Sequence, residues 1–337
     1  MTAGTVPRVA APRLPRARGP LSAAVLTLLT GTEPDPVDVA SADPYGDDLQ
    51  LALYCCYELH YRGFAEVRSE LEWDVRVLAV RGRLESAFEA ALRRDVTGGD
   101  DVASALDALL VEPIDAPGVS HHLMSDGELW QLREYVAHRS IYHLKEGDPQ
   151  AWVIPRLEGH AKAALVSVEH DEYGAGRADR MHAQLFANMM RELGLTAEYG
   201  GYLDLVPAAT LAEVNLMSLC GLHRRLRAAL VGQFAVVELT SSPGSHRLVR
   251  AAERLDAGPA TVSFYREHVE ADAVHEQVVR RGIIAPLLTA EPELAGDVVL
   301  GIQATNLLAD RLSDHLLQAW ADGRSSLRRA LDGTLTT

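Results

Sequence analysis

The chain has 337 residues, of which 47% are hydrophobic, enough to form a full core in one large domain or in a domain with an extension. Its formal net charge of −15 argues against a nucleic-acid-binding surface, and no stretch approaches the roughly 20 apolar residues that span a bilayer. The three cysteines, Cys55, Cys56 and Cys220, fit neither a disulfide framework nor a zinc site. We therefore expect a reduced, cytoplasmic protein that binds neither nucleic acid nor membrane.

The N-terminal third divides into a tail and a helical extension. Residues 1–20 are rich in Pro and Arg and contain neither an acid nor the apolar run of a secretory signal, which predicts a disordered tail. Residues 21–115 are predicted to form an N-terminal helical extension, in which the apolar spacing indicates helices over 21–31, 48–66, 71–96 and 101–111. The Pro-containing stretch 112–127 is typical of a linker.

Residues 116–330 are predicted to form a helical bundle. The pattern indicates helices over 127–146, 156–193 (interrupted at 174–176), 208–221, 222–241, 247–255, 259–281 and 294–322. Few residues are aromatic, Ala, Leu, Arg and Glu are abundant, and no segment sustains the alternation typical of a strand. The fold class that follows is all-α.

Three potential metal ligands share one face of the predicted helix over 259–281. His268, Asp272 and His275 are spaced by four and then three residues, which places them within roughly 60° of arc on an α-helix. Two imidazoles and one carboxylate suit a first-row transition metal, iron above all. The alternative is an exposed helix with scattered charge, but Phe264 and Ala271 lie on the same face and favour an inward orientation.

A helical bundle holds metals with carboxylates and histidines that point inward from several helices, so other acids on apolar faces are candidates. Glu238 follows Val231, Phe234 and Ala235, and Glu172 follows Leu165 and Val168 at helical spacing. His182 shares a face with Leu185, Phe186 and Met189. Glu146 has only Tyr142 and His143 one turn before it. A single helical Glu is most often a solvated surface residue, and a single His is more often a core residue than a ligand. What favours a metal site is the joint occurrence of these groups.

Three segments, HRSIYHLKEGDP, DEYGAGRADRMHAQLF and FYREHVEADAVHE, resemble those of the haem-oxygenase-like di-iron oxidases, also described as iron-containing redox enzymes, over about residues 125–325. The segment YELHYRGF is similar to actinobacterial members. The resemblance implies a haem-oxygenase-like bundle with two Fe ions (Fe²⁺/Fe³⁺) and O₂ as co-substrate. By position it implies a further carboxylate ligand, mobile and catalytic, at Glu238. The other implied metal ligands are Glu146, Glu172, His182, His268, Asp272 and His275.

The implied activity is that of a non-haem di-iron oxygenase or oxidase acting on a small-molecule substrate in specialised metabolism. N-oxygenation of a small amine or an amino-acid-derived compound is favoured. Oxidative C–C cleavage or desaturation of an amino or fatty acid at the same site is the alternative. The resemblance leaves room for an external electron donor or reductase and for a homodimer. Competing hypotheses are a cofactor-free thiaminase-like hydrolase with a cysteine nucleophile, a haem oxygenase, and a non-catalytic bundle that binds iron.

Overall fold

The computed structural model describes residues 11–111 and 118–331, except for the side chains of residues 270–274. All regular elements in these ranges are helical, which confirms the all-α fold class. In chain order the α-helices are α1 (Pro20–Leu29), α2 (Asp47–Glu58), α3 (Val75–Asp95), α4 (Val102–Leu109), α5 (Val119–Ser125), α6 (Leu129–His143), α7 (Asp148–Ala151), α8 (Gly159–Glu172), α9 (His182–Glu192), α10 (Ala208–Leu222), α11 (Arg227–Arg254), α12 (Pro259–Gln277), α13 (Ala285–Ala290) and α14 (Ala295–Ala321). Among the described residues, no helix is both long and apolar enough to cross a membrane.

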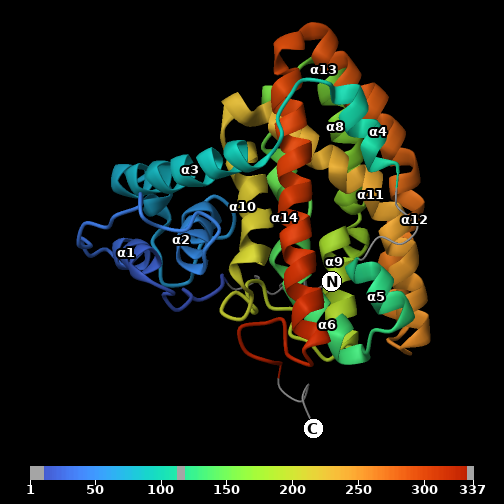
Figure 1. Cartoon of the computed structure of the whole chain (residues 1–337), viewed down its shortest axis with the longest axis horizontal. Helices are drawn as coiled ribbons and strands as arrows, with labels where there is room; N and C mark the ends of the chain where they lie inside the picture. Colours follow the sequence, from blue (N-terminus) through green and yellow to red (C-terminus); the bar gives the residue numbers. More distant parts are fainter. Residues whose placement is uncertain (1–10, 112–117, 332–337) are drawn as a thin grey trace, which may run out of the picture.

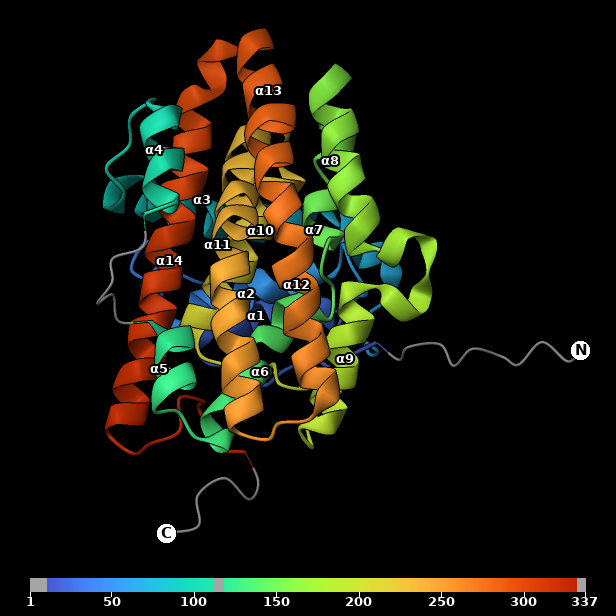
Figure 2. The same cartoon turned by 90° about the vertical axis from the view of Figure 1, so that its right-hand side faces the viewer.

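The centre of the bundle is α11, which packs against α12 on one side and against α14 on the other (Figure 2). Two glycines allow α11 and α14 to approach closely. A Cβ atom on Gly232 would overlap the carbonyl oxygen of Val298, and one on Gly301 would overlap that of Ala229. Because any side chain at either position would push the backbones apart, these glycines fix the distance between the two helices.

One predicted break in the helices is wrong. The helices expected over 222–241 and 247–255 form the single helix α11, with Pro243 inside it. A proline removes one backbone hydrogen bond and normally ends or kinks a helix. Here residues on both sides of Pro243 are buried against neighbouring helices, and the Ser242 hydroxyl donates to the carbonyl of Val269 in α12. Tertiary packing therefore outweighs the local cost of the proline.

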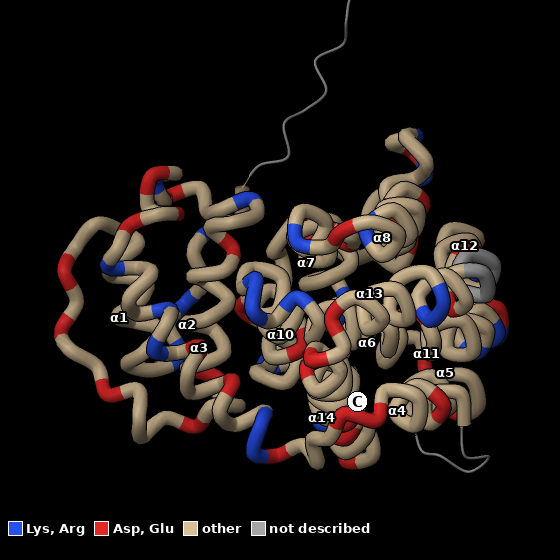
Figure 3. The backbone as a smooth tube through the Cα atoms, turned by 90° about the horizontal axis from the view of Figure 1, so that it is seen from above, with Lys and Arg blue, Asp and Glu red and all other residues tan. Residues whose placement is uncertain are grey.

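Helices α1, α2 and α3 form a separate layer beside the bundle, and α2 packs against α10 (Figure 1). Viewed from above, the acidic loop between α1 and α2 lies at the outer edge of this layer (Figure 3). The buried apolar side chains of the layer and of the bundle belong to one continuous core. A buried ion pair, Lys145 Nζ to Glu58 Oε2 at 3.0 Å, also joins α2 to the turn after α6. The helical extension is thus docked on the bundle.

Part of the predicted tail is tied down. Residues 1–10 lie outside the described residues, but residues 11–19 run between the extension and the bundle. The Arg18 side chain is 1% exposed, pairs with Asp47 and donates to the carbonyl of Leu203. The backbone N–H of Arg16 donates to Asp204, at 2.8 Å. An arginine in a Pro-rich segment is normally solvated, so composition alone does not reveal these contacts.

The predicted linker 112–127 is only partly described. Residues 112–117 lie outside the described part of the chain, whereas α5 occupies residues 119–125 and packs against α11. The extension's α4 likewise packs on α14 and α11 rather than on α1 to α3. Helices from both sides of the predicted linker therefore cover the outside of the bundle.

Candidate metal centre

The first carboxylate of the site, Glu146, lies in the turn that follows α6. The helix expected over 127–146 ends at His143, and the chain reverses at Gly147, whose φ of +85° is in the left-handed region that glycine tolerates. The His143 Nδ1 atom is 2.7 Å from Glu146 Oε1. The ring of His143 stacks on Phe186. The end of α6 thus holds the Glu146 carboxylate in a fixed position inside the bundle.

Glu172 and His182 are brought together by a break between two helices. The helix predicted over 156–193 is two helices: α8 ends at Glu172 and α9 begins at His182. Between them, Gly174 has a φ of +70°, and a Cβ there would lie 2.6 Å from the backbone nitrogen of Met181. His182 Nδ1 lies 2.8 Å from Glu172 Oε2, although the two atoms make no hydrogen bond. A single straight helix would leave these side chains about 80° apart.

His268 and His275 both point into the bundle from α12, as their spacing predicts, and both are buried. The Nδ1–H of His268 donates to the carbonyl of Phe264, at 2.8 Å, which directs Nε2 toward Glu146 Oε1, 3.7 Å away. A backbone carbonyl that fixes the tautomer in this way is typical of a metal-binding histidine. Asp272 lies between the two histidines on α12, but its side chain is outside the described residues, so its predicted role stays a prediction.

A π-helix, Val278–Ile284, directly follows α12 and begins three residues after His275. It packs against α8, where a Cβ on Gly282 would lie 3.0 Å from the Cβ of Ala164. The wider helix adds a residue to the turn, a feature found frequently at functional sites. The π-helix therefore sets the position of α12 against α8, the helix that carries Glu172.

Glu238, His275 and Asp171 form a chain of polar contacts. His275 Nδ1 is 3.0 Å from Glu238 Oε2, and His275 Nε2 is 3.2 Å from Asp171 Oδ2. Glu238 and His275 are buried, whereas the Asp171 carboxylate is half-exposed. Tyr173, the other residue near Glu172 that could orient a histidine, instead donates its hydroxyl to Asp148.

Six of the seven predicted ligands therefore gather in two groups. We call them the first Glu/His group, of Glu146, His182 and His268, and the second Glu/His group, of Glu172, Glu238 and His275. Within each group, one potential ligand atom from every residue lies within 4.8 Å of the others. All six residues are buried. The 2.8 Å contact between His182 Nδ1 and Glu172 Oε2 connects the two groups.

The electrostatics of the site favour a bound cation. Burial alone would lower the pKa of His182, but the carboxylate of Glu172 outweighs it and raises that pKa. Burial alone would also lower the pKa of His275. The Glu238 carboxylate more than offsets this effect, and the pKa of His275 rises to about 9. The buried Glu146 Oε2 and His182 Nδ1 atoms have no hydrogen-bond partner. Buried carboxylates and imidazoles in this arrangement are stabilised when they coordinate a metal ion, and their oxygen and nitrogen atoms suit iron.

Two residues of the site are not among the predicted ligands. Glu169 is 2% exposed, and neither of its carboxylate oxygens has a hydrogen-bond partner. Burial and the carboxylates of Glu172 and Glu238 raise its pKa to about 9. Its position one turn after Leu165 and one turn before Glu172 is the sequence signal that could have identified it. His143, three residues before Glu146, could have been found by the same spacing.

A cavity of about 480 Å³ opens beside the two groups. His143, Glu146, Glu172, Glu238 and His268 line one part of it, and further residues of α5, α6, α10, α11, α12 and α14 line the remainder. Its size is that of a pocket for a small molecule.

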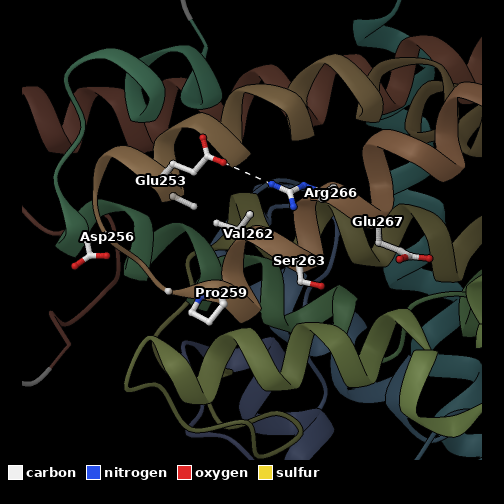
Figure 4. A pocket seen from close by; sticks show the side chains of 9 residues that line it. Glu253, Asp256, Pro259, Val262, Ser263, Arg266 and Glu267 are labelled. Carbon is white, nitrogen blue, oxygen red and sulfur yellow. Dashed lines mark ion pairs between the residues drawn. The ribbon is translucent and has the colours of Figure 1, made fainter.

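A second hollow, of about 560 Å³, lies on the outside at the turn between α11 and α12 (Figure 4). It is crossed by the half-exposed ion pair of Glu253 and Arg266 and contains neither Glu/His group. The chemistry is therefore expected in the inner cavity.

The only cysteine of the bundle region, Cys220, does not line the inner cavity and is buried. Burial raises the pKa of its thiol to about 12, so the reactive thiolate is scarce at neutral pH. This argues against the cysteine-dependent hydrolase.

Comparison with known proteins agrees with this geometry. The model of the family described as iron-containing redox enzyme matches residues 133–310, more than half of the chain. The match begins within α6, ends within α14 and includes all seven predicted ligands. Among curated proteins, none matches the chain.

Proposed function

The chain belongs to the iron-containing redox enzymes, and on that premise we propose that it is an O₂-dependent di-iron oxidase. Two Fe ions would be held by the first and second Glu/His groups, with Glu172 between them. The observation that supports two ions rather than one is that the buried donors form two groups joined at Glu172 and His182. A single six-coordinate ion cannot use all of them together with Asp272.

When bound, the iron pair would supply electrons to O₂ and so oxidise a substrate in the cavity. The side chains of this chain have separate tasks. His143 holds Glu146 in place, the carbonyl of Phe264 fixes the tautomer of His268, and Asp171 orients His275.

Glu238 is proposed as the mobile carboxylate that completes or rearranges the set of ligands. Its helix supports this role, because Pro243, five residues later, cannot donate a hydrogen bond to the carbonyl of Leu239. The backbone beside Glu238 is thus held less tightly than the rest of α11.

We propose a small amine or an amino-acid-derived compound as the substrate, with N-oxygenation as the reaction. Oxidative C–C cleavage or desaturation by the same site is the second candidate. The cavity beside the Glu/His groups favours both over a bundle that only binds iron, because an iron-storing bundle needs no space for an organic substrate.

The test is an anaerobic Fe(II) titration followed by exposure to O₂. We expect saturation at about two Fe(II) per chain and a Mössbauer spectrum of coupled iron ions after oxidation. His182→Ala and His275→Ala should each weaken one of the two sites. Saturation of the wild-type protein at one iron, without a weaker second site, would contradict the di-iron proposal. Two bound irons without O₂ uptake in a broad screen of amines and amino acids would favour the non-catalytic alternative.

A further inference from the structure

An ion pair lies in the wall of the cavity, apart from the two Glu/His groups. Arg139 of α6 and Glu213 of α10 are joined by a 2.9 Å contact between Arg139 NH1 and Glu213 Oε2. Both residues line the cavity. Their side chains retain 24% and 15% of their accessible surface, although the helices that carry them are in the bundle core. The pair is thus accessible to a small molecule in the cavity.

The hydrogen-bonding capacity of Arg139 is not exhausted by Glu213. Its Nε atom is buried and has no hydrogen-bond partner. A purely structural Arg–Glu pair is normally satisfied by both edges of the guanidinium, because an unpaired buried donor is destabilising. An acceptor that enters from the cavity can reach the guanidinium through the 24% of the side chain that stays accessible, but not through the buried Nε.

The position of the pair relative to the proposed iron site is defined by α6. Arg139 lies four residues before His143, about 6 Å along the helix axis, and His143 contacts Glu146 of the first Glu/His group. A group bound by Arg139 is therefore close to the reacting centre but separated from it by at least one helical turn.

Apolar side chains from three helices also line the cavity: Leu216, Met217, Val236, Leu308 and Leu312. These side chains fit the hydrocarbon part of a substrate and exclude water from it. Arg139 and Glu213 then place one positive and one negative group side by side in this wall.

We propose that Arg139 and Glu213 bind the zwitterionic head of an amino acid, with its carboxylate on the Arg139 guanidinium and its ammonium group on Glu213. The pair is electrically neutral as a whole, and so is a zwitterion, which makes it a better match than a lone anion or a lone cation. With the head held at this distance from the first Glu/His group, the oxidised atom belongs to the side chain of the amino acid. This inference rests on the proposed function and deepens it.

The experiment measures binding by isothermal titration calorimetry with chelator-treated protein, so that it does not depend on turnover. The probes are the proteinogenic amino acids, their decarboxylated amines, their methyl esters, and straight-chain fatty acids. We expect at least one amino acid to bind at least tenfold more tightly than its own amine and its own ester. Wild-type protein alone gives this comparison, so it does not depend on the folding of a variant.

Variants then locate the subsite. Arg139→Gln should abolish the preference for the free carboxylate, and Arg139→Lys should restore it only in part, because an ammonium group lacks the two-pronged geometry of a guanidinium. Glu213→Gln should weaken the binding of amino acids at least tenfold. Arg247→Gln is the matched control: Arg247 lines the same cavity, nine residues beyond Glu238 on α11, and its loss should leave the preference unchanged.

Several results would overturn the subsite. They are equal affinity of amines and amino acids, tighter binding of fatty acids than of amino acids, no binding of any amino acid, or an unchanged preference in folded Arg139→Gln. Iron stoichiometry and O₂ uptake are measured on the same preparations. Two irons and O₂ uptake without a carboxylate preference would remove the subsite and leave the di-iron oxidase standing. A carboxylate preference in protein that binds a single iron would remove the di-iron proposal and leave the subsite standing.

Discussion

The environment of Glu169 can be tested by the pH dependence of the stability of the metal-free protein. Glu169→Gln removes the ionisable group and keeps the volume of the side chain. Its folded pKa of about 9 lies above the ordinary value of 4.5, so between these values the folded protein holds a proton that the unfolded chain has lost. Stability therefore falls as pH rises through this window. The free energy of unfolding falls by about 1.4 kcal/mol per pH unit, or by about 4 kcal/mol between pH 5 and pH 8. For a chain of this length, a loss of this size lowers Tm by about 6 °C.

The assay is thermal melting of wild type and Glu169→Gln in chelator at pH 5 and pH 8. Between pH 5 and pH 8, the Tm of the variant should fall by about 6 °C less than the Tm of wild type. At pH 5 it should be no more stable than wild type, because its buried amide also lacks hydrogen-bond partners. Saturating Fe(II) should reduce the slope of wild type, since a nearby cation favours the ionised carboxylate. Glu267→Gln, at an exposed position of α12, is the control. Parallel pH curves for wild type and Glu169→Gln would refute the reasoning.

Three further predictions concern packing, the N-terminal segment and His275. Gly232→Ala should destabilise the protein by about 3 kcal/mol in denaturant titration, because the added Cβ meets a backbone carbonyl. Gly82→Ala, on α3, places its Cβ in open space and should instead stabilise the protein by about 0.5–1 kcal/mol. Deletion of residues 1–10 should leave Tm unchanged, whereas deletion of residues 1–19 should lower it clearly, and equal Tm values would show that the contacts of residues 11–19 contribute nothing. In chelator, the raised pKa of His275 should contribute up to about 3 kcal/mol that is fully present below pH 6.5 and lost as pH rises through about 9, so His275→Gln should flatten this part of the stability curve.

The side chains that a single helix aligns were predicted well from the sequence. His268 and His275 are seven residues apart, and helical periodicity alone places them on one face, as the structure has them. Periodicity also separates Glu238 from the exposed acids, because apolar residues precede it at intervals of one turn. The helical fold class follows from the same regularities. These features depend on local geometry, which the sequence encodes directly.

Features that depend on distant contacts were predicted poorly. His182 approaches Glu172 only because the chain reverses at Gly174. A prediction that treats the segment as one ideal helix cannot find this reversal. The continuity of α11 through Pro243 depends on packing against α12 and α14. Arg18 is buried because Asp47 and the carbonyl of Leu203 meet it from other parts of the chain. In each case the deciding partner is remote in sequence.

The wide spacing of the two Glu/His groups along the chain has a consequence for biosynthesis. Their residues come from five segments between Glu146 and His275, and α11, which carries Glu238, is packed against α14 near the end of the chain. A chain that grows at about 5–20 residues per second presents only isolated carboxylates and imidazoles until α12 has left the ribosome. Such isolated groups bind Fe(II) weakly. Iron would thus be captured only by an almost complete polypeptide, and a truncated translation product would not retain a redox-active metal ion.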